Sequence, residues 1–400
     1  MDLFDKCKSF TRAREVMEAG FYPYFRPISS GQDTEVTIRG QRLIMIGSNN
    51  YLGLVSDPRV KEAAIEALRK FGTGCSGSRF LNGTLELHEE LEARLATFMG
   101  KEACLIFSTG FQTNLGTLAA IVGRNEYLIQ DKANHASLVD GSRLSFGKTL
   151  RYEHNDMEDL RRVLEHVSSD AARLVVTDGV FSMEGDLARV PDLAELKRRY
   201  HFRLLIDDAH AIGVMGPKGN GTAAHFGLND EADLITGTFS KSLASLGGFV
   251  VGDEDVIHFL KHFSRELIFS ASIPPANVAA ALRALDIIET EPERREKLWE
   301  ITHRMRSEYQ RLGFNTGPTE TPIIPIYIGP DDLCFAFWKE LTIHGIFTNP
   351  VIPPAVPPGQ ALIRTSYTAT HTKAQLDRVL EVFEKVGKEL GVIGRPVGVE

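Results

Sequence analysis

Lys241 is the residue in this 400-residue chain whose position most directly suggests chemistry. It lies in Gly237-Thr238-Phe239-Ser240-Lys241-Ser242, just after an apolar run that predicts a strand over 234–236. A second predicted strand, 204–207, ends at Asp207, and His210 follows three residues later. A buried lysine can lose its proton and form an imine with an aldehyde. Pyridoxal phosphate (PLP) requires such a lysine, a carboxylate for its pyridinium nitrogen and donors for its phosphate. Together these residues predict a PLP enzyme.

Asp207 and His210 each have an ordinary structural alternative. An aspartate at a strand end more commonly caps the helix that follows it, whereas a PLP site would use it to keep the pyridinium nitrogen protonated. His210 could donate a hydrogen bond to the ring hydroxyl, or it could simply pack in a turn. We place Asp208 behind the ring rather than against it. The combination with Lys241, and not any one residue, carries the prediction.

A phosphate site is predicted where Gly110-Phe111-Gln112 follows the predicted strand 103–107 and opens a helix. The first N–H groups of a helix have no intrahelical partner, and the helix dipole favours an anion there. Thr238 and Ser240, which lie beside the lysine in the same motif, add hydroxyl groups for this phosphate. Other turns from a strand through glycine into a helix share this pattern, so Gly110 and Phe111 are candidates only together with Lys241.

Three further polar residues are candidates because they lie in or just beyond predicted strands. His135, in Asn134-His135-Ala136-Ser137, could stack on the cofactor ring or could belong to a helix cap. Ser182 could direct its hydroxyl at the cofactor. Arg364 lies between apolar residues of a predicted strand over 361–366, and it could grip a carboxylate with two parallel hydrogen bonds or form a salt bridge at a sheet edge.

Composition and motifs exclude several other classes of protein. The formal charge of −8 does not favour nucleic acid or an anionic membrane surface as a partner. The four cysteines form no CxxC pair, which argues against a disulfide framework or zinc site and fits a reducing cytoplasm. No segment approaches the roughly 20 apolar residues of a membrane span, although a peripheral membrane contact stays open. Gly72-Thr73-Gly74-Cys75-Ser76-Gly77 matches GxGxxG but follows a helix, so it is no dinucleotide fingerprint.

The order of predicted elements gives the fold class. Short apolar runs alternate with helical stretches from about residue 57, which predicts an α/β protein with a mostly parallel central sheet and helices on both faces. Ligands on such sheets bind beyond the carboxyl ends of the strands. We expect an N-terminal arm with a helix over 3–19 and short strands (1–50), a large PLP-binding domain (51–285) and a smaller α+β C-terminal domain (286–400).

Five blocks of the sequence, in this order and spacing, resemble the α-oxoamine synthases, a family of fold-type I PLP enzymes. They are Asn50-Tyr51-Leu52-Gly53, Asn134-His135-Ala136-Ser137, Asp207-Asp208-Ala209-His210, Thr238–Ser242 and Ile363-Arg364. The resemblance implies that Lys241 forms the Schiff base and then acts as acid and base at Cα. It also implies that Asp207 pairs with the pyridinium nitrogen, while His210 bonds the ring oxygen and His135 stacks on the ring.

The resemblance assigns the remaining roles to residues that the spacing alone does not connect. Gly110, Phe111, Thr238 and Ser240 would bind the phosphate, and Ser182 would contact the cofactor. Ser270 would reach the phosphate from the other subunit, which implies a homodimer with shared active sites. Asn50 and Arg364 would bind the amino-acid carboxylate, beside His135.

Within the family, the lysine motif and Phe80-Leu81-Asn82-Gly83-Thr84 resemble those of bacterial serine palmitoyltransferases. That branch implies condensation of L-serine with a long-chain acyl-CoA, palmitoyl-CoA, to 3-ketodihydrosphingosine with release of CO₂ and CoA. Another condensing synthase, either a glycine C-acetyltransferase or an 8-amino-7-oxononanoate synthase, stays open. So do a PLP aminotransferase and a silent partner subunit, although silent subunits tend to lose the imine lysine.

Overall fold

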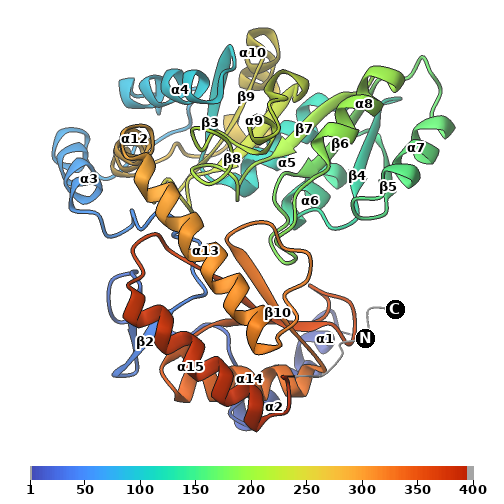
Figure 1. The fold of residues 1–400 in the computed structure, drawn as a ribbon. Helices are drawn as coiled ribbons and strands as arrows, with labels where there is room; N and C mark the ends of the chain where they lie inside the picture. Colours follow the sequence, from blue (N-terminus) through green and yellow to red (C-terminus); the bar gives the residue numbers. More distant parts are fainter. Residues whose placement is uncertain (1, 394–400) are drawn as a thin grey trace.

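A computed structural model describes residues 2–393 of the chain. The last seven residues of the predicted small domain, 394–400, therefore lie outside the described residues. Figure 1 shows a large lobe built around one sheet and a smaller lobe below it, with the long helix α13 (Pro292–Leu312) running from one to the other.

The large lobe is organised by a seven-stranded sheet in the order β3-β9-β8-β7-β6-β4-β5. The run from β8 through β7, β6 and β4 to β5 is parallel, while β9 is antiparallel to both of its neighbours. The strands are β3 (Ala103–Phe107), β4 (Tyr127–Asp131), β5 (Lys148–Tyr152), β6 (Arg173–Asp178), β7 (Arg203–Asp207), β8 (Leu234–Thr238) and β9 (Gly248–Gly252). The prediction of a mostly parallel sheet is confirmed.

Helices cover both faces of this sheet, because neighbouring residues of each buried strand point to opposite sides. In β6, Leu174 and Val176 pack into one hydrophobic cluster, whereas Val175 packs into the other. The first cluster is closed by α5 (Gly110–Ile121), α6 (Ala136–Leu144), α10 (Glu254–Phe263) and α11 (Arg265–Ile268). The second is closed by α3 (Pro58–Phe71), α4 (Glu86–Met99), α7 (Met157–His166), α8 (Val190–Tyr200), α9 (Thr222–His225) and α12 (Pro275–Thr290).

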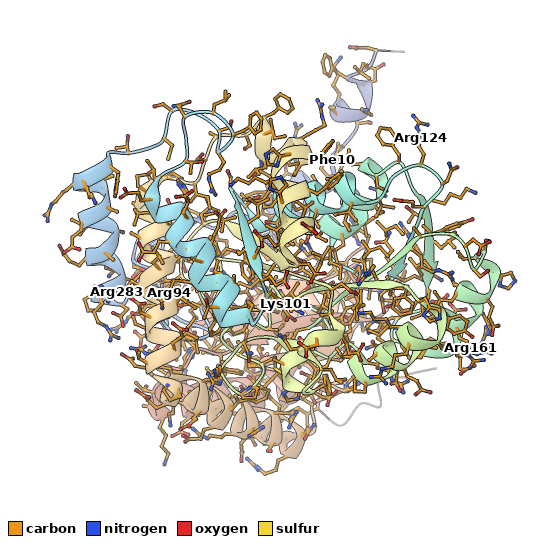
Figure 2. The ribbon with its side chains drawn as sticks, turned by 90° about the horizontal axis from the view of Figure 1, so that it is seen from above. Phe10, Arg94, Lys101, Arg124, Arg161 and Arg283 are labelled. Carbon is orange, nitrogen blue, oxygen red and sulfur yellow. The ribbon has the colours of Figure 1, made fainter. Side chains whose placement is uncertain are left out.

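Ion pairs join two of these covering helices. Figure 2, the view from above, shows Arg94 of α4 and Arg283 of α12 close together. Both contact the same carboxylate, Asp286, at 2.9 and 3.3 Å, and Arg94 also reaches Glu289 at 2.5 Å. The pairs are part-exposed, so we expect each to contribute less than about 1 kcal/mol and mainly to fix how α4 lies against α12.

The smaller lobe holds two short sheets and its own hydrophobic cluster. β13 (Ala361–Ser366) lies between β10 (Ile323–Gly329) and β12 (Asn349–Val351), antiparallel to both. The second sheet joins β1 (Glu35–Ile38) and β2 (Gln41–Met45) to β11 (Ile346–Phe347). α13, α14 (Asp331–Ile343) and α15 (Lys373–Glu389) pack on this core. The early strands thus join the end of the chain, and the three-part division into 1–50, 51–285 and 286–400 stays a prediction.

Three local expectations differ from the structure. The single helix expected over 3–19 is two short helices, α1 (Asp5–Lys8) and α2 (Arg12–Glu18), with no buried residue to hold them together. The sequence does not predict the edge strand β5, because its KTLRY segment lacks an apolar run; in the structure this strand is mostly exposed. The apolar run 249–251 predicts one more strand of the alternation; β9 forms there, but it runs antiparallel because the short connection from β8 contains no crossover helix. Among residues 2–393, no helix combines the length and apolar character needed to cross a bilayer.

Candidate active site

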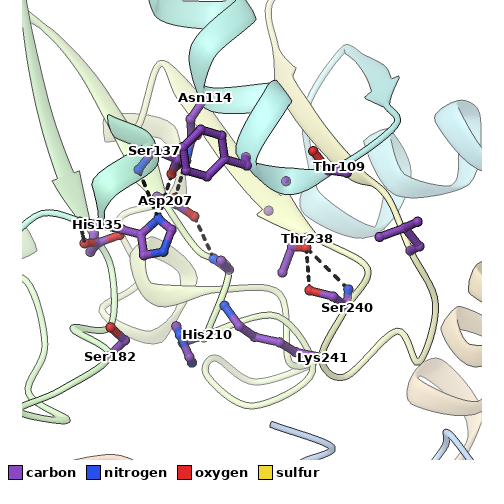
Figure 3. Close-up of a pocket in the computed structure, with 16 residues that line it drawn as sticks. Thr109, Asn114, His135, Ser137, Ser182, Asp207, His210, Thr238, Ser240 and Lys241 are labelled. Carbon is purple, nitrogen blue, oxygen red and sulfur yellow. Dashed lines mark hydrogen bonds between the residues drawn. The ribbon is translucent and has the colours of Figure 1, made fainter. Parts of the chain in front are cut away.

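A cavity of about 300 Å³ opens at the carboxyl ends of β6, β7 and β8, beside the first turns of α5 and α6 (Figure 3). It brings together most of the residues that the sequence singled out: Gly110, Phe111, His135, Ser182, Asp207, His210, Thr238, Ser240 and Lys241. Thr109, Asn114, Ser137 and Asp178 also line it. The strand register explains this convergence, since Asp207 of β7 pairs with Asp178 of β6 and with Thr236 of β8.

Asp207 is the last residue of β7, only 4% exposed, with both carboxylate oxygens held. Oδ2 accepts a hydrogen bond from Asn114 Nδ2 at 2.6 Å, and Oδ1 accepts one from the Ala209 backbone N–H at 2.9 Å. No helix follows directly: residues 209–211 form a turn and Ile212 forms an isolated bridge, so the alternative of a helix cap does not apply. The sequence does not single out Asn114. It lies four residues after Gly110 and therefore on the same face of α5, and this i+4 spacing is the signal that could have identified it.

Lys241 reaches into the same cavity from the turn after β8 (Figure 3). Burial lowers the pKa of its ammonium group to about 8, aided by the charge of Arg364 and opposed by Asp207 and Asp178. A substantial fraction of the amine is therefore neutral near pH 8, which is the form that can attack an aldehyde. Lys241 and Asp207 line one cavity, and its volume of about 300 Å³ suits a small heterocycle.

His210 lies beside Lys241 and is held by a residue that the sequence did not single out. Its Nδ1 lies 2.8 Å from the hydroxyl of Tyr51. Burial, with help from the charges of Lys241 and Arg364, lowers the pKa of His210 well below its usual value, so the ring is neutral. Burial also raises the pKa of Tyr51, which keeps its proton. A tyrosine that donates to Nδ1 leaves Nε2 as the N–H, which can then donate to a ring oxygen in the cavity.

His135 combines the two roles that its sequence context left open. It is the N-cap of α6, and its Nδ1 accepts from the Ser137 backbone N–H at 3.2 Å. Its own backbone N–H donates to Asp178 Oδ2 at 2.7 Å, which ties it to the end of β6. The imidazole nevertheless lines the cavity, with the Phe111 ring 6.3 Å away (Figure 3). Capping therefore orients the ring instead of competing with a role at the cofactor.

The first turn of α5 and the turn after β8 together make a small polar cradle. Thr109 caps α5 by accepting from Gln112 N–H at 3.1 Å. The N–H groups of Gly110 and Phe111 have no intrahelical acceptor, because they lie in the first turn of the helix. Thr238 Oγ1 lies 3.0 Å from Ser240 Oγ. A Cβ on Gly110 would lie 2.8 Å from Thr238, so only glycine lets the two elements approach this closely. Free N–H groups and hydroxyls at a helix start fit a phosphate.

Arg364 is buried next to this cavity. It lies on β13, the central strand of its sheet, and is 6% exposed. Nε donates to the Ser182 carbonyl at 2.6 Å, and Nη2 donates to Asn49 Oδ1 at 3.0 Å. No carboxylate within 2–393 pairs with it, so the salt-bridge alternative does not apply. A buried guanidinium with spare N–H groups and no counter-ion suits an anionic ligand.

Besides Arg364, two predicted residues do not line the cavity. Asn50 is buried, and its Oδ1 accepts from the Val55 backbone N–H at 3.3 Å; the neighbouring Asn49 is the residue that contacts Arg364. Ser270 contacts the first turn of α5, where Gln112 Nε2 donates to its hydroxyl at 3.1 Å. The predicted role of Ser270 requires a second subunit, so it stays a prediction, as does the carboxylate contact of Asn50.

Comparison with known proteins places this site in a family. Residues 41–383 match the family model of aminotransferase class I and II. A serine palmitoyltransferase of Sphingobacterium spiritivorum is 53% identical over 97% of both chains. A serine palmitoyltransferase from S. paucimobilis, solved with a bound PLP-myriocin aldimine, superposes with a TM-score of 0.95 at 35% identity, covering 98% of this chain and 100% of that one. An 8-amino-7-oxononanoate synthase of Thermoanaerobacter pseudethanolicus is 42% identical over 96% of this chain and 97% of its own.

The chain belongs to the aminotransferase class I and II family and has the fold-type I architecture of PLP-dependent transferases. Within that family its similarity is greater to serine palmitoyltransferases, at 53%, than to the 8-amino-7-oxononanoate synthase, at 42%. The resemblance read from the sequence motifs is confirmed.

Proposed function

We propose that this chain is a PLP-dependent acyltransferase that condenses L-serine with a long-chain acyl-CoA, palmitoyl-CoA, to give 3-ketodihydrosphingosine, CO₂ and CoA. The observation that carries the proposal is the convergence of Lys241, Asp207 and His210 on one cavity beside the unpaired Arg364. The choice of serine and of a palmitoyl chain rests on the serine palmitoyltransferases that the chain resembles at 53% identity.

The donor set of the cavity fits PLP. The carboxylate of Asp207 suits a protonated pyridine nitrogen, and His210 supplies a donor for the ring oxygen. The cradle of Gly110, Phe111, Thr238 and Ser240 suits the phosphate, while the ring of His135 offers a face for stacking. When bound, PLP supplies an electron sink that stabilises negative charge at Cα of an amino acid.

Each residue then has a defined task in the condensation. Lys241, whose pKa of about 8 lies near working pH, removes the proton from Cα of serine and later returns one. Asp207, whose carboxylate is held by Asn114 and by the Ala209 backbone N–H, would pair with the ring nitrogen. Arg364 grips the serine carboxylate, and its bond to the Ser182 carbonyl holds the guanidinium in place. The side chain of Ser182 lines the cavity and would contact the cofactor.

The proposal extends to assembly and location. Ser270, which lies beside the exposed Phe269, would reach the phosphate in the site of a second subunit of a homodimer. The chain would act in the cytoplasm, with peripheral membrane contact where its acyl substrate and product partition. Neither nucleic acid nor a metal enters the reaction.

The test is a matrix of L-serine, glycine and L-alanine against acyl-CoAs from acetyl to stearoyl, with products identified by mass. The proposal expects 3-ketodihydrosphingosine from serine and palmitoyl-CoA, and no product from Lys241→Ala. A product only from glycine with acetyl-CoA, or only from alanine with a pimeloyl thioester, would replace it with one of the other condensing synthases. A keto acid formed without thioester consumption would indicate an aminotransferase, and no product from any pair would indicate a silent partner subunit.

A further inference from the structure

His154 forms a polar cluster just outside the cavity that the mechanism does not use. It lies in the turn between β5 and α7, and its side chain is 29% exposed. Nδ1 is 3.1 Å from Asp131 Oδ1, and Nε2 is 3.0 Å from Asp186 Oδ2. A carboxylate only accepts hydrogen bonds, so both ring nitrogens must carry a proton. His154 is therefore an imidazolium bridging two acids, with its ring 4.3 Å from that of Phe181.

The electrostatic balance of the cluster agrees with this geometry. Burial alone would lower the pKa of His154, but hydrogen bonds to Asp131 and Asp186 together raise it to about 10. Other ionisable groups also act on this cluster: Glu184 interacts with His154 and with both acids, Asp178 and Tyr152 interact with Asp131, and Tyr327 interacts with Asp186. Burial raises the pKa of the Glu184 carboxyl. Asp186 Oδ1 is buried without a partner, so Asp186 depends on His154 and Asn155 for its contacts.

Each acid shapes a different loop of the active site. Asp131, the last residue of β4, accepts from the backbone N–H groups of Ala133 at 2.8 Å and Asn155 at 2.9 Å. This fixes the short loop that leads to His135. Asp186 closes the loop after β6, where its carbonyl accepts from Phe181 N–H at 3.1 Å. That loop carries Ser182, whose carbonyl holds Arg364.

We propose that His154 is a positioning residue that locks the loop of His135 to the loop of Ser182, and so fixes the stacking face of the site relative to Arg364. The inference rests on the proposed function, because it concerns how the site grips the amino-acid carboxylate. The two loops follow the adjacent parallel strands β4 and β6, and the ring of His154 bonds to an acid from each, while the adjacent Asn155 contacts the same two acids through its backbone N–H and its Nδ2.

The test replaces His154 with glutamine, which keeps hydrogen-bonding capacity and removes the charge. Holoenzyme H154Q is compared with H166Q, a variant of an exposed histidine on α7 whose ring contacts the Arg162 carbonyl. We expect the KM for L-serine to rise about tenfold in H154Q, since small displacements of a positioned group carry effects of this size. The calorimetric Kd for L-serine without acyl-CoA should rise in parallel, while the KM for palmitoyl-CoA stays within twofold. H166Q should match wild type.

Asp186→Asn provides a second variant that does not depend on H154Q folding. It keeps an acceptor for His154 but removes one of the two charges, and it should show the same serine-specific change. The double variant H154Q/D186N should be no worse than the poorer single variant, because both substitutions break one interaction. A folded H154Q or D186N with a serine KM within twofold of wild type overturns the proposal. So does an equal rise in both KM values, which would indicate general loosening of the lobe.

Failure of the proposed function would be seen separately. If wild type turns over glycine or alanine instead of serine, the substrate assignment fails, and the same KM comparison is made with the amino acid that it accepts.

Discussion

Replacing Arg364 with lysine tests how the site recognises its amino acid. The guanidinium donates through Nε to the Ser182 carbonyl and through Nη2 to Asn49, which leaves further N–H groups for a carboxylate. Lysine keeps the charge but cannot hold both protein acceptors and grip a carboxylate with two parallel bonds. Loss of one charge-assisted hydrogen bond costs about 1.5–3 kcal/mol. At 1.36 kcal/mol per factor of ten, that is roughly a 10- to 150-fold rise in the KM for serine.

The assay measures steady-state KM for L-serine and for palmitoyl-CoA in R364K and in the matched control R311K. Arg311 lies on α13 in an exposed pair with Glu308, so its replacement should leave both values unchanged. Thermal melting temperatures are measured alongside the kinetics. An acceptor at Ser182 or Asn49 that is left without a hydrogen-bond donor in R364K costs about 1–3 kcal/mol of stability. A serine KM within twofold of wild type in R364K, or an equal rise for palmitoyl-CoA, would refute the assigned role of Arg364.

Three further outcomes are expected. The rate at which the apoenzyme binds PLP covalently should rise with pH through about 8, the pKa to which burial lowers Lys241, because only the neutral amine attacks the aldehyde. Asp207→Asn should move this midpoint to lower pH, since Asp207 raises the pKa of Lys241. An unchanged midpoint would contradict the electrostatic coupling of the two groups. Gly110→Ala places a Cβ 2.8 Å from the facing threonine and should weaken PLP binding about tenfold by fluorescence titration, whereas Gly31→Ala, with nothing within 4 Å, should not. Burial raises the pKa of Asp208 to about 7, so its contribution to stability is full at low pH and is lost as the pH rises through about 7. The denaturant midpoint of Asp208→Asn should therefore increase relative to that of wild type between pH 5 and pH 8. A difference in midpoint that stays constant with pH would contradict this.

The cavity-lining residues that could be predicted from sequence share one property: each lies at the end of a short apolar run or soon after it. Asp207 and Lys241 come at the end of β7 and just after β8, and the carboxyl ends of parallel strands meet at one edge of the sheet. Gly110 opens α5 at that edge, and His135 precedes α6. Local sequence was therefore sufficient to predict that these residues meet in space.

Residues that act through contacts distant in sequence gave no such signal. Asn114 bonds to Asp207 across 93 positions, and Asn49 reaches Arg364 across 315. Asn49 shows the difficulty, because it and its neighbour Asn50 look alike in sequence and only the turn geometry decides which of them faces the arginine. The roles of Ser270 and Asn50 stay predictions.

By itself the sequence determined the fold class, the edge of the sheet where the site lies and the lysine and the aspartate that meet there, because alternation of strands and helices sets where strand ends meet. Tertiary structure alone decided the chemistry of these groups. Burial and neighbouring charges lower the pKa of Lys241, keep His210 neutral and protonate His154, and they leave Arg364 without a counter-ion. Such effects depend on which charges and how much protein surround a group, and those neighbours come from strands and loops far apart along the chain.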